Sequence, residues 1–263
     1  MLKLFVTDLD GTLLENHHTV KEENKRSIQT LIESGVEFAV ATGRMDRDIV
    51  EILKMMEQTG HRVSQNGGFV FDKTGKLIFS ETFTDDLSKR IHQTLSTHSD
   101  FYSITTADEV YVTERTPLLE QFEKLAYFPI IEFKDVADHY GSTVFPVKFN
   151  IIGETDQIVK IKDIVNQELG QEMESYLSDK YCVDFVPKGI SKALGLTHLI
   201  DKLNLEASEI AVIGDSHNDI PMLEMTPHSY AMSSALPEVK AKASNVVENV
   251  YDAINDLKQK GLF

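Results

Sequence analysis

The sequence predicts an α/β fold in which a parallel β-sheet core is interrupted by an inserted α+β domain. Two patterns support this prediction. Over residues 1–83, and again over 188–263, short apolar runs alternate with stretches that have the spacing of amphipathic helices, as in parallel sheets. Over residues 84–187, strand-like runs joined by turn residues stand between helices, which indicates an antiparallel sheet with helices on one face. The core is therefore discontinuous in sequence.

The N-terminal part of the core alternates strand and helix. The run Leu2–Val6 is almost continuously apolar, as in a strand that is buried on both faces. The capping-box pattern of Thr19–Glu22 starts a helix, and Gly35 stops it. The further elements expected before the insert are a strand at 36–41, a helix at 45–56, a short strand at 63–64 and a hairpin of 69–72 with 76–79. Right-handed units of this kind build a Rossmann-like parallel sheet.

The insert and the C-terminal part of the core differ in pattern. The insert is expected to contain a helix around 87–95, strands at 101–105 and 110–113, a helix at 117–126, a strand at 144–152, a helix around 158–165 and two strands that flank 178–180. Strand–helix alternation then resumes. Its expected elements are a helix at 194–203, strands at 210–214, 229–232 and 245–247, and a last helix from about residue 251.

Composition restricts the partners and the compartment. The 26 Lys and Arg against 42 Asp and Glu leave a net charge of −16, which disfavours nucleic acids and anionic membranes. No apolar run approaches the roughly 20 residues of a membrane span, and none resembles a leader. The single cysteine, Cys182, lies in an apolar run; we expect a packed thiol and a reducing compartment. These features favour a cytoplasmic protein.

Polar residues follow three of the expected core strands. They form the segments Asp8–Thr12, Thr42–Arg44 and Gly214–Asp219. The carboxyl ends of parallel strands meet at one edge of a sheet, where ligands bind. Acids gathered there are unfavourable unless a cation or a proton compensates them. Because this set is rich in oxygen and lacks cysteine, it favours Mg²⁺, which binds carboxylates, water and substrate phosphate.

The order of the motifs resembles the haloacid dehalogenase superfamily of phosphohydrolases, and within it the Cof-type subfamily. The matching segments are DLDGTLL at 8–14, ATGR at 41–44, KGISKALGL at 188–196 and GDSHNDIPML at 214–223. They span nearly the whole chain. The resemblance implies a Mg²⁺-dependent phosphatase that works through an aspartyl-phosphate, with the insert as a cap that selects the substrate.

The resemblance also assigns roles to the acids. Asp8 would attack phosphorus and bind the metal. Asp10 would protonate the leaving alcohol and then activate water, while its backbone carbonyl contacts Mg²⁺. Asp215 would be the remaining protein ligand. Since Asp10 has to carry a proton when the ester oxygen leaves, we expect burial and the neighbouring acids to raise its pKa.

Five further residues would hold the phosphoryl group in this family. Thr42 would contribute its hydroxyl, Gly43 and Leu9 their backbone N–H groups, and Asn218 its side-chain amide. Lys192 would neutralise the charge on the nucleophile and on the phosphate. Such neutralisation is needed because an aspartate is repelled by a phosphate dianion.

Several of these side chains allow a second interpretation. Thr42 could also cap a helix, and Arg44 fits a phosphate contact as well as a structural ion pair. Asp219 is expected to orient the metal site, with a helix-start role as the alternative. Lys192 is preferred to Lys188 because the family lysine opens the helix after the insert. No role is assigned to the histidines near these motifs, His17, His18 and His217; the first two are expected to be exposed.

The favoured function is the hydrolysis of small phosphorylated metabolites, such as sugar phosphates or similar phosphomonoesters. The alternatives are a phosphomutase or phosphotransferase of the same superfamily, and a sensor that binds phosphate esters with little turnover. Asp10 disfavours a dehalogenase, which needs no second aspartate. Within the insert, Lys148 and Asn150 share one face of an expected strand; they are candidates for substrate selection, with an ordinary exposed sheet face as the alternative.

Overall fold

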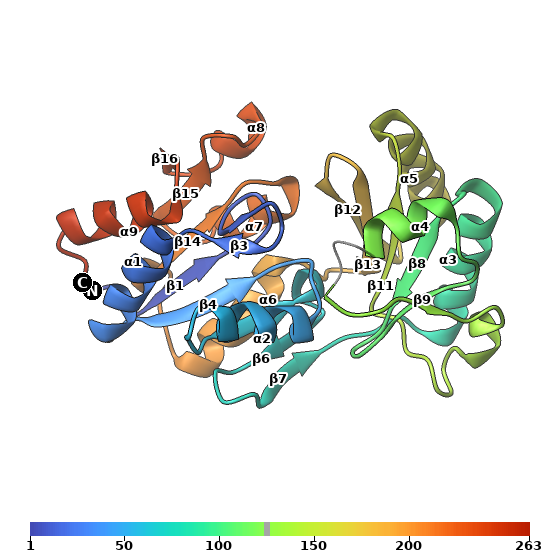
Figure 1. The fold of residues 1–263 in the computed structure, drawn as a ribbon, viewed down its shortest axis with the longest axis horizontal. Coiled ribbons are helices and arrows are strands. Elements are labelled where there is room, and N and C mark those ends of the chain that lie inside the picture. Colours follow the sequence, from blue (N-terminus) through green and yellow to red (C-terminus); the bar gives the residue numbers. More distant parts are fainter. Residues whose placement is uncertain (124–126) are drawn as a thin grey trace. The chain divides into compact units, whose positions relative to one another are not determined.

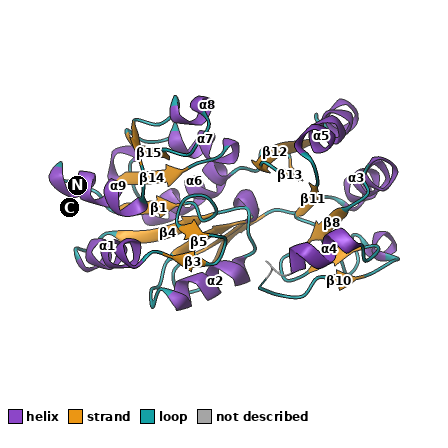
Figure 2. Ribbon diagram, turned by 45° about the horizontal axis from the view of Figure 1, so that its top comes forward, coloured by secondary structure: helices purple, strands orange, loops and turns teal. Residues whose placement is uncertain are grey.

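The computed structural model describes residues 1–123 and 127–263, which divide into two compact units. One unit comprises residues 1–80 and 191–263, and the other comprises 81–190. The first contains a largely parallel sheet and the second a largely antiparallel one (Figures 1 and 2). The predicted α/β fold with an inserted α+β segment is therefore confirmed.

The sheet of the first unit has eight strands among the described residues. Their spatial order is β16 (Asn245–Val247), β15 (His228–Met232), β14 (Ile210–Gly214), β1 (Leu4–Thr7), β4 (Glu37–Ala41), β5 (His61–Ser64), β6 (Phe69–Phe71) and β7 (Leu77–Ser80). Neighbours from β16 to β5 are parallel, whereas β6 and β7 pair antiparallel. Strand β1 thus lies between β14 and β4, and their carboxyl ends share one edge.

Helices cover both faces of this sheet. They are α1 (Glu22–Glu33), α2 (Asp46–Met55), α6 (Lys192–Leu203), α7 (Ile220–Leu223), α8 (Pro237–Lys240) and α9 (Val250–Gln259). Successive strand residues point to opposite faces: Leu4 and Val6 pack with Leu196 of α6, while Phe5 is buried outside that cluster. A short hairpin of β2 (Leu14–Glu15) and β3 (Thr19–Val20), which was not predicted, follows β1.

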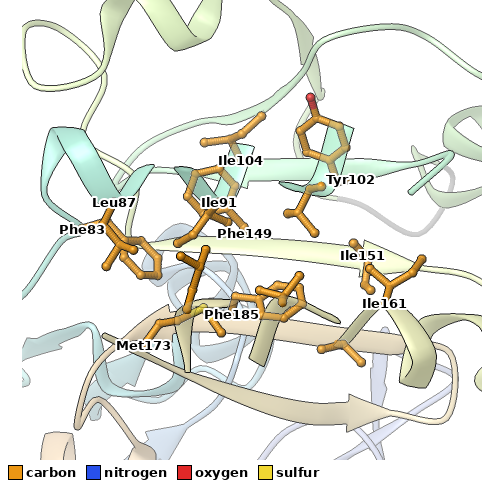
Figure 3. Close-up of a cluster of buried hydrophobic side chains, with 14 of the residues drawn as sticks. Phe83, Leu87, Ile91, Tyr102, Ile104, Phe149, Ile151, Ile161, Met173 and Phe185 are labelled. Carbon is orange, nitrogen blue, oxygen red and sulfur yellow. The ribbon is translucent and has the colours of Figure 1, made fainter. Parts of the chain in front are cut away.

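The second unit has a six-stranded sheet, counted over the described residues. The spatial order is β10 (Ile131–Glu132), β9 (Val110–Val112), β8 (Tyr102–Thr105), β11 (Lys148–Ile152), β13 (Cys182–Pro187) and β12 (Met173–Asp179). One face packs on α3 (Asp85–His98) and α5 (Thr155–Leu169), and Phe149 and Phe185 lie in that apolar cluster (Figure 3). Such a cluster gives this unit a core of its own.

Two predicted boundaries in the insert differ from the structure. The helix expected at 117–126 is α4 (Pro117–Phe122), and residues 124–126 lie outside the described part of the chain. The strand expected from residue 144 begins at Lys148. Pro146 has no N–H to donate to a neighbouring strand, and its carbonyl instead accepts the N–H of Phe83.

No helix in the described ranges has both the length and the apolar character that a membrane crossing needs.

Candidate active site

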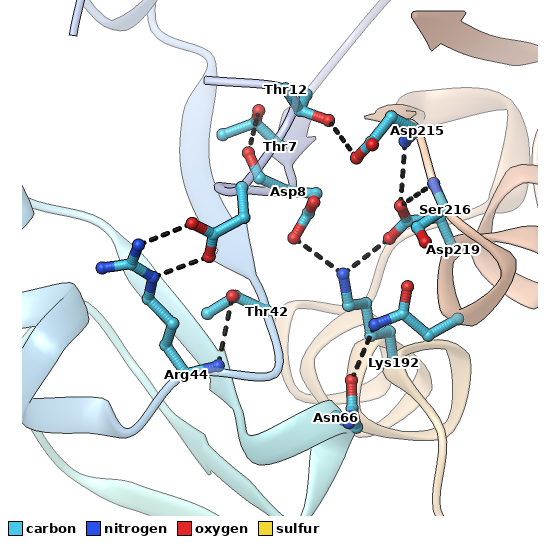
Figure 4. Close-up of polar contacts among 12 residues, drawn as sticks. Thr7, Asp8, Thr12, Thr42, Arg44, Asn66, Lys192, Asp215, Ser216 and Asp219 are labelled. Atoms are coloured by element: carbon cyan, nitrogen blue, oxygen red, sulfur yellow. Dashed lines mark hydrogen bonds and ion pairs between the residues drawn. The ribbon is translucent and has the colours of Figure 1, made fainter. Parts of the chain in front are cut away.

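Lys192 joins two buried carboxylates at the carboxyl end of β1 (Figure 4). Its Nζ lies 2.7 Å from Asp8 Oδ1 and 2.6 Å from Asp219 Oδ1. All three side chains are buried, and Lys192 is the first residue of α6, after the capping residue Ser191. Burial by itself lowers the pKa of Lys192, but Asp219 and Asp8 outweigh it and raise the pKa. The lysine therefore stays charged between the two acids.

Asp215 completes a group of three acids. Carboxylate oxygens of Asp8, Asp215 and Asp219 lie within 4.8 Å of one another. One oxygen of Asp215 accepts a hydrogen bond from the Thr12 hydroxyl (3.0 Å), and Oδ2 of Asp219 accepts the N–H groups of Asp215 and Ser216 (2.9 Å each). Asp219 holds Lys192 and caps the turn that starts η5 (His217–Asp219), so the helix-start role is present; its role in orienting a metal stays a prediction.

The titration of these acids fits a divalent cation. Burial, opposed mainly by Lys192, raises the pKa of Asp8 well above its ordinary value. Burial and the nearby Asp219 raise the pKa of Asp215 to about 6. Two carboxylates with raised pKa values are held together where a cation would supply the missing charge. Lys192 and two backbone N–H groups already occupy both oxygens of Asp219. The side chains suited to Mg²⁺ are therefore those of Asp8 and Asp215.

The turn after β1 requires glycine at position 11, where the backbone passes close to Asp215. Gly11 has a φ of +78°, and a Cβ built on it would lie 2.4 Å from Asp215 Oδ2. Only glycine combines this backbone conformation with so close an approach. The glycine of DLDGT therefore makes room for the carboxylate contributed by the end of β14.

Asp10 has partners that oppose the expected rise of its pKa. Arg44 donates from Nε to Oδ2 (2.6 Å) and from Nη2 to Oδ1 (2.5 Å), and Nδ1 of His17 lies 2.8 Å from Oδ1. Burial raises the pKa of Asp10, but the hydrogen bonds and charges of His17 and Arg44 lower it well below its ordinary value. The predicted rise was wrong because the neighbours of this carboxylate are cations rather than acids.

The structure bears on the alternatives for two residues, the ion pair of Arg44 and the helix-capping role of Thr42. Arg44 forms the ion pair, and its guanidinium also donates to the backbone oxygen of His17 (2.8 Å). Thr42 is buried at the end of β4, and its hydroxyl accepts the Arg44 N–H (3.2 Å). Met45, and not Thr42, is the residue that precedes α2. Gly43 stands between Thr42 and Arg44 in this loop.

Asn218 and Leu9 are also buried in the first unit. Nδ2 of Asn218 donates to Oδ1 of Asn66 (3.0 Å), and the Leu9 carbonyl accepts the N–H groups of Thr12 (3.2 Å) and Leu14 (2.8 Å). Lys188 lies in the second unit, where it pairs with Glu174 (3.0 Å), so the lysine beside Asp8 is Lys192. The ring of His217 faces Glu238 (Nε2 to Oε1, 3.3 Å).

The candidates in the insert are partly buried. Lys148 Nζ lies 3.4 Å from Oδ1 of the buried Asp184, and the Ser103 hydroxyl donates to Oδ1 of Asn150 (2.5 Å). Cys182 lies on the same sheet and forms no disulfide, and its Sγ is 3.8 Å from Asp184 Oδ1. Lys148 and Asn150 therefore belong to a polar network, and the alternative of an ordinary exposed face was wrong.

Two residues near the site had no predicted role. His17 is exposed in the turn between β2 and β3, as expected, but its ring reaches Asp10. The side chain of Asn66 holds Asn218, although no role is predicted for Asn66 from the sequence. The QNGG sequence at 65–68 signals a tight turn, but nothing in it says where the asparagine points.

Comparison with known proteins gives the family. The model of the haloacid dehalogenase-like hydrolases matches residues 5–254. The chain belongs to this family. The match includes Asp8, the insert and the helix that begins at Lys192, so the predicted resemblance and the predicted hydrolase class are confirmed.

Several relatives of similar length carry the names of phosphatases. A 5-amino-6-(5-phospho-D-ribitylamino)uracil phosphatase from Escherichia coli is 26% identical over 261 residues, which cover 97% of this chain and 95% of the relative. A Bacillus subtilis protein of the same name is 25% identical and covers 94% of this chain and 93% of its own. An HMP-PP phosphatase from Yersinia pestis is 26% identical over 91% of this chain and 87% of its own.

Solved structures share the fold along the entire chain. A haloacid dehalogenase-like hydrolase from B. subtilis superposes with a TM-score of 0.88 at 22% identity and covers 100% of both chains. One from Bacteroides thetaiotaomicron has a TM-score of 0.85 at 22% identity and covers 98% of this chain and 100% of its own. At such identities the likeness concerns the fold.

Proposed function

We propose that this protein is a Mg²⁺-dependent phosphatase that hydrolyses small phosphomonoesters through an aspartyl-phosphate on Asp8. The observation that carries the proposal is the arrangement at the end of β1. There, a buried lysine holds Asp8 while Asp215 stands beside it. A buried nucleophilic carboxylate, a fixed cation and a second carboxylate suited to Mg²⁺ are the requirements of phosphoryl transfer to aspartate.

The proposed first step transfers the phosphoryl group to Asp8. Bound Mg²⁺ would supply the positive charge that lets two anions meet. A carboxylate oxygen of Asp8 bonds to phosphorus as the ester P–O bond breaks, and Asp10 gives a proton to the departing alcohol oxygen. Because Arg44 and His17 hold Asp10 ionised in the described state, Asp10 has to give up these contacts and take up a proton before it can donate one to the ester oxygen.

The second step returns Asp8 to its free form. Asp10 takes a proton from water, the water oxygen bonds to phosphorus, and the P–O bond to Asp8 breaks to release inorganic phosphate. In both steps Lys192 keeps Asp8 in place. The Thr42 hydroxyl, the N–H groups of Gly43 and Leu9 and the amide of Asn218 are proposed to hold the phosphoryl oxygens, as their counterparts do in the family.

The proposed substrates are small phosphorylated metabolites in the cytoplasm. The names of the relatives support this class, since they include a phosphorylated ribitylaminouracil. The net charge of −16 disfavours polyanionic macromolecules as substrates. The inserted unit, residues 81–190, is proposed as the cap that selects among small esters. Cys182 is the single cysteine of the sequence and carries a thiol, which suits a reducing compartment.

Phosphate release tests the proposal. We expect Mg²⁺-dependent release of inorganic phosphate from p-nitrophenyl phosphate and from at least one sugar phosphate, and its loss in Asp8→Asn. Turnover by Asp8→Asn that is comparable to that of wild type would contradict the mechanism. A phosphomutase would instead need a bisphosphate and transfer the group to a sugar, and a sensor would bind the esters without releasing phosphate.

A further inference from the structure

The turn after β5 has an unusual backbone for buried polar residues. Gln65, Asn66 and Gly67 have φ values of +50°, +57° and +96°, and all three residues are buried. Left-handed residues other than glycine are disfavoured and persist only where their surroundings hold them. Here, a Cβ on Gly67 would lie 2.1 Å from the carbonyl oxygen of Ser191, so the turn is packed directly against the start of α6.

This turn also contacts two loops that the proposed function uses. The backbone N–H of Gln65 donates to the Arg44 carbonyl (2.8 Å), and that of Asn66 donates to the Thr42 carbonyl (2.9 Å). The side chain of Asn66 reaches in another direction: its Oδ1 accepts the buried hydrogen bond from Asn218 Nδ2 (3.0 Å). Asn66 therefore connects the loop after β4 with the loop after β14.

We infer that Asn66 is a positioning residue that orients the side-chain amide of Asn218 toward the phosphoryl group. A primary amide has two N–H donors in one plane. Once one of them bonds to Asn66, the direction of the second is set before substrate arrives, which is the condition for effective binding of an oxyanion. The inference rests on the proposed function, because it takes Asn218 to be a phosphate ligand.

The turn explains why asparagine suits this position. Asparagine is among the few residues that tolerate the left-handed conformation, and it also carries the acceptor that Asn218 needs. Glycine tolerates the same φ but has no side chain. The substitution Asn66→Gly therefore removes the acceptor without forcing the turn to change, and it isolates the role of the side chain.

Inhibition by inorganic phosphate tests the inference. The Ki of phosphate against p-nitrophenyl phosphate hydrolysis is measured for wild type, Asn66→Gly, Asn218→Ala and the double variant, together with thermal unfolding. We expect each single variant to raise Ki by about tenfold. In the Asn218→Ala background, Asn66→Gly should change Ki by less than about twofold, because a residue that acts through Asn218 has nothing left to orient.

Asn204→Gly is the matched control, since Asn204 is an exposed asparagine with φ +53° at the end of α6. Its Ki should equal that of wild type. The inference would be overturned by an unchanged Ki in Asn66→Gly or in Asn218→Ala. It would also be overturned if Asn66→Gly changed Ki equally with and without Asn218. Failure of the proposed function is distinguishable, because wild type itself would then neither release phosphate nor be inhibited by it.

Discussion

At the scale of single residues, Lys192 dominates the electrostatics of the site. It is buried between Asp8 and Asp219, and its pKa is raised by both. A buried charge that loses its partner is far more costly than an exposed one. The same lysine therefore stabilises the fold and keeps the nucleophile in place.

Replacing Lys192 should destabilise the protein strongly. Lys192→Met leaves two carboxylates without a cation, and we expect the free energy of unfolding at neutral pH, measured with urea and without Mg²⁺, to fall by about 3–5 kcal/mol. Lys188→Met is the control, because the exposed Lys188–Glu174 pair should contribute at most about 1 kcal/mol. Equal effects of the two substitutions would contradict this description of the site.

Arg44 should control the protonation of Asp10. Because Arg44 donates to both carboxylate oxygens, Arg44→Gln is expected to raise the pKa of Asp10 toward its ordinary value, while the contact with His17 still lowers it. Carboxyl NMR titration measures this change. Arg62→Gln, which removes the partner of Asp46 instead, should leave Asp10 unaffected; a pKa that stays low in Arg44→Gln would show that the pair does not hold Asp10.

At the scale of elements, the site depends on how tightly turns pack against strand ends. Gly11 approaches Asp215, and Gly67 approaches Ser191. Both glycines have positive φ. A side chain at either position would move a backbone or a carboxylate that the proposed chemistry needs.

Gly11→Ala should weaken Mg²⁺ binding as well as the fold. A left-handed alanine costs about 1–2 kcal/mol, and the added Cβ would displace Asp215. Gly35→Ala is the matched control, since Gly35 has a φ of +94° and nothing within 4 Å of its Cβ. We expect similar losses of stability in both variants, but weaker Mg²⁺ binding by calorimetry only in Gly11→Ala. Equal Mg²⁺ affinities would refute the role of Gly11.

The hairpin of β6 and β7 should lose stability in acid through Asp72. Hydrogen bonds from the Thr74 hydroxyl and from the N–H groups of Lys76 and Thr74 lower the pKa of Asp72 to about 2. A lowered pKa stabilises the folded state above the unfolded value of about 3.9, and this contribution disappears as the pH falls toward 2. Asp72→Ala should therefore lower the free energy of unfolding, measured with urea, at pH 6. The loss should become progressively smaller below pH 4. A difference in unfolding free energy between wild type and Asp72→Ala that does not depend on pH would count against this role of Asp72.

The convergence of strand ends could be predicted, but side-chain directions in turns could not. Asp8 and Asp215 follow apolar strands, so a parallel sheet brings them together wherever they lie in the sequence. His17 and Asn66 reach their partners from left-handed turn residues, and hydrophobic periodicity contains no information about such positions. The pKa of Asp10 was mispredicted for the same reason. Whether this pKa rises or falls depends on contacts from two separate loops, which carry His17 and Arg44.

At the scale of the whole molecule, the chain combines a parallel-sheet unit that holds all the proposed catalytic groups with an inserted unit that has its own core. The separation is visible in the sequence as a change from strand–helix alternation to hairpins. Substrate selection was not readable there, because the sequence does not say which residues of the insert a substrate contacts; the engagement of Lys148 and Asn150 in a polar network with Asp184 and Ser103 does not decide it. The match to the haloacid dehalogenase-like hydrolases spans both units.

Phosphorylation of Asp8 is the central claim, and rapid quenching tests it most directly. The protein is mixed with p-nitrophenyl phosphate and Mg²⁺, quenched in acid within the first turnovers and mapped by peptide mass spectrometry. We predict one phosphoryl group on the peptide that contains Asp8, and none in Asp8→Asn. A phosphoryl group on another residue, or steady phosphate release with no phosphorylated Asp8 at any quench time, would contradict the mechanism.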